Sequence, residues 1–180
     1  MTRTRRLTAA LIAAVASTGF ATLANAETKK VTMNLISAKG DGASIGTIAL
    51  EDSPQGLILK PDLKGLPPGV HGFHLHANPS CAPGEQDGKK AAGIAAGGHF
   101  DPHETHKHLG PDLADGHQGD LPVLNVIDDG SAMGSLLAPH LKVADLTGHA
   151  LMIHEGGDNY SDQPKPLGGG GARIACGVVK

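Results

Sequence analysis

Polar and apolar residues alternate with a period of two along several short stretches of the chain. The clearest is 30–35, Lys-Val-Thr-Met-Asn-Leu, and 47–50 and 57–59 repeat the pattern less strictly. Successive side chains of a strand point to opposite faces, so this pattern predicts strands with one buried face. Further strands are expected where short apolar runs end in turn residues, at 70–76, 121–127, 131–137, 150–154 and 172–179.

Turn residues separate these stretches, and the pattern contains no convincing amphipathic helix. Asp129-Gly130 predicts a hairpin between 121–127 and 131–137. The chain of 180 residues has 26 glycines and only 2% aromatic residues, so its core must consist of Val, Ile, Leu and Ala between tight turns. These features favour an antiparallel all-β sandwich or barrel of about eight strands.

Two long stretches, 78–120 and 155–171, lack a strand pattern. Loops of this length in a compact domain are usually functional or disordered. The first ends at Asp120 and contains five of the 11 histidines, namely His99, His103, His106, His108 and His117. A bound metal would supply order that the loop's own packing cannot, and a disordered histidine-rich metal scavenger is the alternative.

His74 and His76 lie two residues apart in the predicted strand 70–76, so both point to one face. Two imidazoles that converge from a rigid strand form half of a site for zinc or copper. From spacing alone, two hydrogen-bonded strand histidines are an equally good interpretation. His71 lies on the opposite face of the predicted strand.

The first 26 residues have the pattern of a secretory signal peptide. Three arginines precede an apolar, alanine-rich run, and Ala24-Asn25-Ala26 matches a small-x-small cleavage site. Cleavage after Ala26 leaves residues 27–180 as one domain. The formal net charge is −3 before the leader's arginines are lost, so we expect no nucleic-acid partner and no membrane partner after cleavage.

The only two cysteines are Cys81 and Cys176. In an exported protein an even number of cysteines indicates a disulfide, and here only one pairing is available. Two free thiols are the alternative. A bond between these residues would hold the segment after the histidine pair against the last predicted strand.

Six motifs occur in the order found in copper/zinc superoxide dismutases. They are GFHLH (72–76), GGHFDP (97–102), KHLGP (107–111), GHQGDLP (116–122), LMIHEGGDNYSD (151–162) and GARIACGVV (171–179). The chain resembles this family over the whole expected mature region, and its glycine-rich loops and leader are similar to those of the bacterial periplasmic branch. The resemblance implies an eight-stranded Greek-key β-sandwich, or flattened barrel, with two long functional loops.

The resemblance also implies an activity and a set of site residues. The activity is disproportionation of superoxide to dioxygen and hydrogen peroxide, with one copper and one zinc per subunit. The implied copper ligands are His74, His76, His99 and His154. The implied zinc ligands are His108, His117 and Asp120, together with His99 as a bridge between the two metals.

Other residues receive roles from the same resemblance. Asp158 would join His74 to His108, and Arg173 would receive the substrate anion. Lys89 and Lys90 would draw superoxide towards the copper. Only the KHLGP match favours His108 over His103 or His106.

We expect the remaining histidines, His71, His103, His106, His140 and His149, to be structural or exposed. A periplasmic copper-binding or copper-delivery protein of the same fold is the alternative function. The sequence permits a homodimer as well as a monomer.

Overall fold

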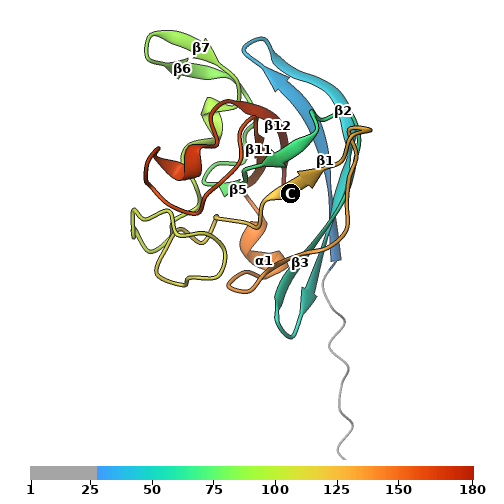
Figure 1. Cartoon of the computed structure of the whole chain (residues 1–180), viewed down its shortest axis with the longest axis vertical. Coiled ribbons are helices and arrows are strands. Elements are labelled where there is room, and N and C mark those ends of the chain that lie inside the picture. The colour runs from blue at the N-terminus through green and yellow to red at the C-terminus, as the bar shows by residue number, and fades with distance from the viewer. Residues whose placement is uncertain (1–27) are drawn as a thin grey trace, which may run out of the picture.

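The computed structural model describes residues 28–180, and the predicted signal peptide lies outside this range. The described chain is almost entirely β, as Figure 1 shows. Its strands are β1 (Thr28–Ser37), β2 (Gly40–Ser53), β3 (Gly56–Leu63), β4 (Gly69–His71), β5 (Phe73–His76), β6 (Gly84–Gln86), β7 (Lys89–Ala91), β8 (Leu124–Val126), β9 (Ala132–Met133), β10 (Leu136–Ala138), β11 (Ala150–His154) and β12 (Arg173–Val178).

Within residues 28–180, helical structure is limited to short segments. These are η1 (Ile94–Ala96), α1 (Val143–Leu146) and η2 (Leu167–Gly169). Among residues 28–180, none of these helices has the length and apolar character that a membrane crossing requires.

An antiparallel sheet of eight strands forms the framework. Seven strands follow the order β10-β3-β2-β1-β12-β11-β5, and β9 also pairs with β3. Strands β1, β2 and β3 are consecutive, while β12 returns from the end of the chain to lie beside β1, which is a Greek-key arrangement. The sheet curls around its apolar face (Figure 1). The predicted all-β fold class is therefore confirmed.

The alternating pattern explains which strand residues form the core. Val31 and Met33 of β1, with Ile48 and Leu50 of β2, are buried, while Lys30 and Thr32, which alternate with the two β1 residues, are exposed. The burial of such side chains from successive strands, at roughly 25 cal/mol per Å² of apolar area, provides the main driving force for closing the curled sheet.

Three local predictions were wrong. The predicted strand 70–76 divides at Gly72, so that β4 pairs with β8 and β5 pairs with β11. Gly130 forms the expected turn, with φ 80°, but β8 and β9 on either side of it pair with β4 and β3 rather than with each other. The stretch 78–120 also contains the antiparallel hairpin β6–β7.

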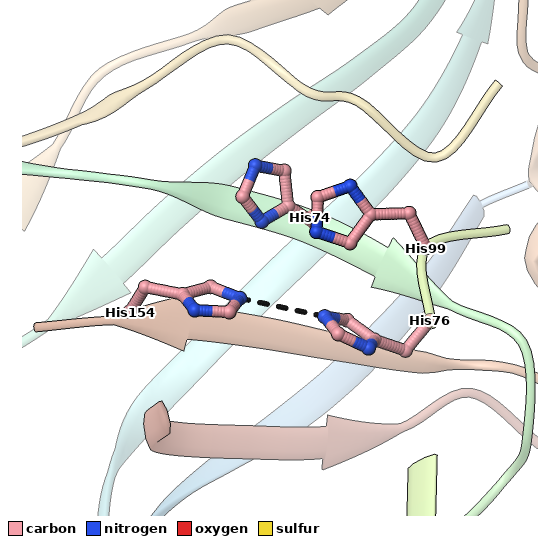
Figure 2. Close-up of side chains that lie close together, drawn as sticks. All are labelled: His74, His76, His99 and His154. Atoms are coloured by element: carbon pink, nitrogen blue, oxygen red, sulfur yellow. Dashed lines mark hydrogen bonds between the residues drawn. The ribbon is translucent and has the colours of Figure 1, made fainter. Parts of the chain in front are cut away.

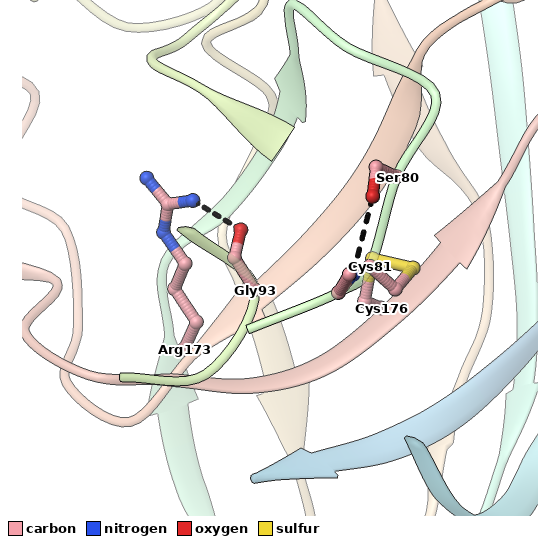
Figure 3. Close-up of a disulfide and its surroundings, with 6 residues drawn as sticks. Ser80, Cys81, Gly93, Arg173 and Cys176 are labelled. Atoms are coloured by element: carbon pink, nitrogen blue, oxygen red, sulfur yellow. Dashed lines mark hydrogen bonds between the residues drawn. A yellow bond between two sulfur atoms is a disulfide. The ribbon is translucent and has the colours of Figure 1, made fainter. Parts of the chain in front are cut away.

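The disulfide between Cys81 and Cys176 is present and joins the loop after β5 to β12, as Figure 3 shows. It closes a loop of 95 residues. Restriction of so long a loop in the unfolded chain stabilises the fold by about 4 to 5 kcal/mol in the chain-entropy model. A small apolar cluster that includes Ala96, Met152 and Cys176 packs around the bond.

Candidate metal centre

Strand β5 carries two histidines on one face and two core residues on the other. Phe73 and Leu75 belong to the main apolar core, whereas His74 and His76 point away from it. All four side chains are fully buried. The core covers the face of β5 that carries Phe73 and Leu75. The face that carries His74 and His76 is therefore covered too, by the long loop that follows β5.

This loop pairs with β5 through main-chain hydrogen bonds. Leu75 accepts from the N–H of Phe100 (2.8 Å) and donates to the carbonyl of Gly119 (2.8 Å). A Cβ atom at Gly119 would lie 2.3 Å from the Leu75 oxygen, so only glycine permits this approach. The pairing sets His99 opposite His76 and Asp120 opposite His74.

His154 ends β11, the neighbour of β5. A register shift between Ile153 and His154 separates this last residue from the regular ladder. Figure 2 shows that the imidazoles of His74, His76, His99 and His154 surround a common space. One ring nitrogen of each lies within 4.8 Å of the corresponding nitrogens of the other three.

The outer nitrogens of these rings have fixed partners. His76 Nδ1 donates to the carbonyl of Gly97 (2.9 Å), and His154 Nδ1 lies 3.3 Å from the carbonyl of Gly171. His74 Nε2 donates to Asp158 Oδ2 (2.7 Å). Because a neutral imidazole has one N–H, these contacts leave a lone pair on each inner nitrogen.

The inner nitrogens lack donors among residues 28–180. His74 Nδ1 and His99 Nε2 are buried without a hydrogen-bond partner. His76 Nε2 and His154 Nε2 face each other at 3.4 Å, although both are acceptors in the tautomers that their outer contacts favour. Four converging lone pairs suit a cation, and imidazole nitrogen is a preferred ligand of copper.

Burial keeps these rings neutral. Burial, followed by repulsion from His74, lowers the pKa of His154 to about 2 and that of His99 to about 3. Burial and the neighbouring His99 also lower the pKa of His76 well below its usual value. A neutral ring can donate its lone pair to a metal at physiological pH.

A second group of ligand atoms converges on Asp120 Oδ1. The Nδ1 atoms of His99, His108 and His117 lie 2.8, 2.9 and 3.4 Å from it. For His108 and His117 the contact lacks hydrogen-bond geometry, so both nitrogens remain unpartnered in the described chain. The set of three imidazoles and one carboxylate is a donor set that zinc prefers.

Both His74 and His117 lie near enough to Asp120 to complete this candidate zinc site. The group around Asp120 whose ligand atoms all lie within 4.8 Å of one another contains His74, His99 and His108, and it leaves out His117. We favour His117, because His74 Nε2 is already bonded to Asp158 and its one free nitrogen faces the other cluster.

Asp120 is held as a carboxylate. Burial alone would raise its pKa, but the close imidazoles of His108, His117 and His99 outweigh burial and keep the pKa far below its usual value. Its Oδ2 atom also accepts from the N–H groups of Leu109 (3.1 Å) and Gly110 (3.3 Å). These bonds orient Oδ1 towards the histidines.

Asp158 connects the two clusters. Its Oδ2 accepts from His74, and its Oδ1 lies 2.8 Å from His108 Nε2. Burial lowers the pKa of His108, but the close carboxylates of Asp120 and Asp158 outweigh it and raise this pKa to about 9. A Cβ atom at Gly168 would overlap Asp158, which explains a glycine at that position.

Sequence reasoning missed Asp162. Its Oδ2 accepts from the main-chain N–H of His108 (3.1 Å), and its Oδ1 accepts from that of Leu167 (3.1 Å). These two bonds lower the pKa of Asp162. The side chain therefore ties the loop of His108 to the loop that precedes β12. An isolated aspartate in a polar loop gives no sequence signal for such a role.

Arg173 begins β12 and is opposite His154 in the register. Its Nη1 donates to the carbonyl of Gly93 (2.6 Å, Figure 3) and its Nη2 to that of Gly97 (2.7 Å). Arg173, His76, His99 and His154 line one pocket of about 300 Å³. A larger groove of about 710 Å³ lies between β1, β12 and the disulfide loop, away from the histidines.

The lysines and the spare histidines lie elsewhere. Lys89 and Lys90 are exposed on β7 and do not line the pocket. His103, His106 and His140 are exposed. His149 packs against the ring of Phe100.

His71 is buried, with 3% of its surface exposed. Its Nδ1 lies 2.7 Å from the carbonyl of His154 and its Nε2 lies 2.8 Å from that of Pro67. The side chain therefore supports the main chain of a clustered histidine, which spacing alone did not reveal.

Comparison with known proteins agrees with this arrangement. A family model described as copper/zinc superoxide dismutase (SODC) matches residues 44–179. Superoxide dismutase (Cu-Zn) of Escherichia coli (strain K12) is 53% identical over 177 residues, which cover 98% of this chain and 99% of that protein.

Two solved structures are similar over the same region. The Cu/Zn superoxide dismutase from Brucella abortus has a TM-score of 0.83 and 53% identity, covering 86% of this chain and 100% of that one. The monomeric copper, zinc superoxide dismutase from Salmonella enterica has a TM-score of 0.76 and 57% identity, with the same coverage. Sequence and fold thus lead to one conclusion: the chain belongs to the copper/zinc superoxide dismutase family.

Proposed function

We propose that this protein disproportionates superoxide to dioxygen and hydrogen peroxide, with one copper and one zinc per subunit. The observation that carries the proposal is the convergence of four imidazole lone pairs beside a fixed arginine. Curated relatives named Superoxide dismutase (Cu-Zn) support the same activity.

Copper would be held by His74 Nδ1 and by the Nε2 atoms of His76, His99 and His154. Zinc would be held by Asp120 Oδ1 and by the Nδ1 atoms of His99, His108 and His117. The unpartnered state of these buried nitrogens supports the assignment. When bound, copper supplies one-electron redox chemistry, and zinc supplies positive charge without redox chemistry of its own.

His99 is the one residue with a nitrogen in each group of ligand atoms. Its Nδ1 faces Asp120 and its Nε2 faces the pocket. Reduction of superoxide to hydrogen peroxide consumes two protons, and Nε2 would carry one of them, and release it into the pocket, when it is not held by copper. This position makes His99 the proton-carrying residue of the proposed reaction.

Arg173 recognises the anion. The two carbonyl bonds fix its guanidinium at the pocket, and the remaining N–H groups can bind superoxide. Lys89 and Lys90 would add a weaker attraction. Lys90 is opposite Glu85 in the β6–β7 hairpin and Asp87 lies in its turn, so the local field of these lysines is partly neutralised.

The alternative is a copper-binding or copper-delivery protein without activity. The fixed Arg173 argues against it, because a copper carrier needs no anion site. Copper, zinc and superoxide-dependent activity should be measured on one sample of purified protein. One copper and one zinc without activity would favour the alternative, whereas activity proportional to copper content supports the dismutase.

We further infer export to the periplasm with cleavage after Ala26, which leaves residues 27–180 as the mature domain. The disulfide and the bacterial relatives support this location. The intact mass of protein purified from the periplasm should correspond to a chain that begins at Glu27 and lacks two hydrogens. A mass that includes the leader would contradict cleavage.

We favour a monomer over a homodimer, because the similar Salmonella enterica structure is described as monomeric. Light scattering with size-exclusion chromatography would distinguish the two states.

A further inference from the structure

The pocket beside the histidines is large for a diatomic anion. It measures about 300 Å³, and Arg173 is the one lysine, arginine or carboxylate among the described residues that line it. A cavity of this size would also accept larger oxyanions, because the oxygens of phosphate match the N–H groups of a guanidinium. The charge of Arg173 alone therefore does not explain selection of superoxide.

Leu167, on the wall of this pocket, has an unfavourable backbone conformation. Its φ is 54°, in the left-handed region that residues with a Cβ seldom adopt. The next residues, Gly168 and Gly169, have φ of 68° and 80°, which glycine adopts freely. A leucine at 167 opposes the local backbone preference, and such outliers indicate a role for the side chain.

The surrounding structure holds Leu167 in place. Asp162 Oδ1 accepts from its N–H (3.1 Å), and its carbonyl accepts from the N–H of Gly170 (3.4 Å). Asp162 is itself bound to the main chain of His108 through its other oxygen. The position of Leu167 is thus linked to the loop that carries a candidate zinc ligand.

The side chain of Leu167 forms part of an apolar wall of this pocket. Leu167 is 41% exposed, and with Pro166 it lines the pocket from the η2 side. Ala91, Ala92 and Ile94 line it from the β7–η1 side, where, among the described residues, Gln86 is the one uncharged polar side chain beside them. The segments β7 and η2 are far apart in sequence, and Figure 1 shows them on one side of the molecule.

An apolar wall discriminates between anions by their hydration. An anion that passes between apolar side chains loses water contacts, and the cost rises steeply with its charge. Superoxide carries a single charge, whereas phosphate is mainly doubly charged above neutral pH and binds water strongly.

We propose that Leu167 is a specificity-determining residue, whose apolar side chain disfavours multiply charged, strongly hydrated oxyanions at Arg173. This inference rests on the proposed function, in which Arg173 receives superoxide.

The test compares Leu167→Asn with Leu167→Met in protein loaded with copper and zinc. Asparagine is close in size to leucine, tolerates the left-handed region and is polar, whereas methionine keeps the apolar character. Binding of inorganic phosphate at pH 7.5 is measured by ³¹P relaxation, which reports proximity to paramagnetic copper(II) without turnover. We expect phosphate to bind Leu167→Asn at least about fivefold more tightly than wild type, and Leu167→Met to resemble wild type.

Leu113→Asn is the matched control, because Leu113 is 53% exposed and does not line the pocket. Its phosphate affinity should equal that of wild type. If Leu167→Asn lost metal or structure, Leu167→Gly would replace it, since glycine adopts this φ freely. Wild-type phosphate affinity in the folded, metal-loaded variant would overturn the proposal.

Addition of Arg173→Ala to Leu167→Asn separates this inference from the proposed function. The double variant should lose the gained phosphate affinity. A gain that persists without Arg173 would overturn the inference, because phosphate would then bind elsewhere. Arg173→Ala alone with unchanged superoxide capture would instead refute anion recognition by Arg173, whatever the result at Leu167.

Discussion

His76 and Arg173 donate hydrogen bonds to the same acceptor, the carbonyl oxygen of Gly97. This oxygen lies 2.9 Å from His76 Nδ1 and 2.7 Å from Arg173 Nη2. A candidate copper ligand and the proposed anion-binding side chain are therefore positioned by one main-chain atom. Under the proposed function, this arrangement fixes the distance between the side chain that attracts the anion and the place where the anion reacts.

The first prediction concerns anion capture. Arg173→Ala should lower kcat/KM by about tenfold or more and flatten its dependence on ionic strength, because a focused local field is lost. Copper and zinc contents should stay unchanged, since arginine is not a ligand. Pulse radiolysis at several salt concentrations measures both effects.

The double variant Lys89→Ala/Lys90→Ala should lower kcat/KM less than Arg173→Ala, because neither lysine lines the pocket. A full metal content with wild-type rate and salt dependence in Arg173→Ala would refute this account of capture.

The second prediction separates the two metals. His117→Ala should lose zinc and loosen its loop but still bind copper, whereas His154→Ala should lose activity and keep zinc. Metal analysis after dialysis gives both contents. His103→Ala is the matched control, because His103 is exposed in the same loop. Unchanged zinc in His117→Ala would show that the zinc assignment is wrong.

The third prediction concerns the carboxylate that touches both clusters. Asp158→Asn should weaken zinc binding by about 10- to 100-fold, since a residue that orients metal ligands is lost. Competition with a chelator measures the affinity. Asp128→Asn changes an exposed aspartate and should have no effect. Equal zinc affinity of Asp158→Asn and wild type would contradict the proposed link.

The fourth prediction concerns the disulfide. Cys81→Ser/Cys176→Ser should lower the free energy of unfolding by about 3 to 5 kcal/mol, because the unfolded chain regains the entropy of a long loop. Urea denaturation of metal-free protein measures this change without a contribution from metal binding. A difference below about 1 kcal/mol would show that the bond contributes little.

The fifth prediction concerns acid. Folding lowers the pKa of His154 to about 2 and that of His99 to about 3, from the usual 6.5. Below pH 6.5 the unfolded chain therefore binds more protons than the folded one, and the stability of metal-free protein should fall from about pH 6.5 towards pH 3.

Urea denaturation of metal-free protein between pH 4 and pH 7 measures this slope. His154→Gln should reduce it, while His140→Gln, which changes an exposed histidine, should leave it unchanged. An equal slope in wild type and His154→Gln would contradict the lowered pKa of His154.

Several strands were predictable because their faces differ. In β1 the buried Val31 and Met33 alternate with exposed Lys30 and Thr32, and this contrast is visible in the sequence. The hairpin β6–β7 was not predictable from the alternating pattern. Its Asp87-Gly88 turn, with φ of 52° and 72°, nevertheless has the composition typical of a two-residue hairpin turn. Its strands contain Glu, Gln and Lys, so they lack the apolar face that identifies a strand.

In the candidate metal site, the sequence predicted the strand face of two histidines but not the contacts that support them. The spacing of His74 and His76 correctly placed both side chains on one face of β5. The contact of His71 with the main chain of His154 depends on Gly72, where β4 separates from β5. The contact of Asp162 with the main chain of His108 depends on two loops that approach each other from distant parts of the chain. Such contacts arise from tertiary structure and leave no periodic signal.

Under the proposed assignment, His99 and Asp158 each contact both metal sites. Binding of one metal then orders a ring and a carboxylate that the other metal also uses, so the two affinities are thermodynamically coupled. Linkage requires this coupling to be reciprocal: the factor by which zinc raises the affinity for copper equals the factor by which copper raises the affinity for zinc. A cell that supplies only one of the two metals would therefore obtain a protein that holds even this metal less tightly than the protein loaded with both.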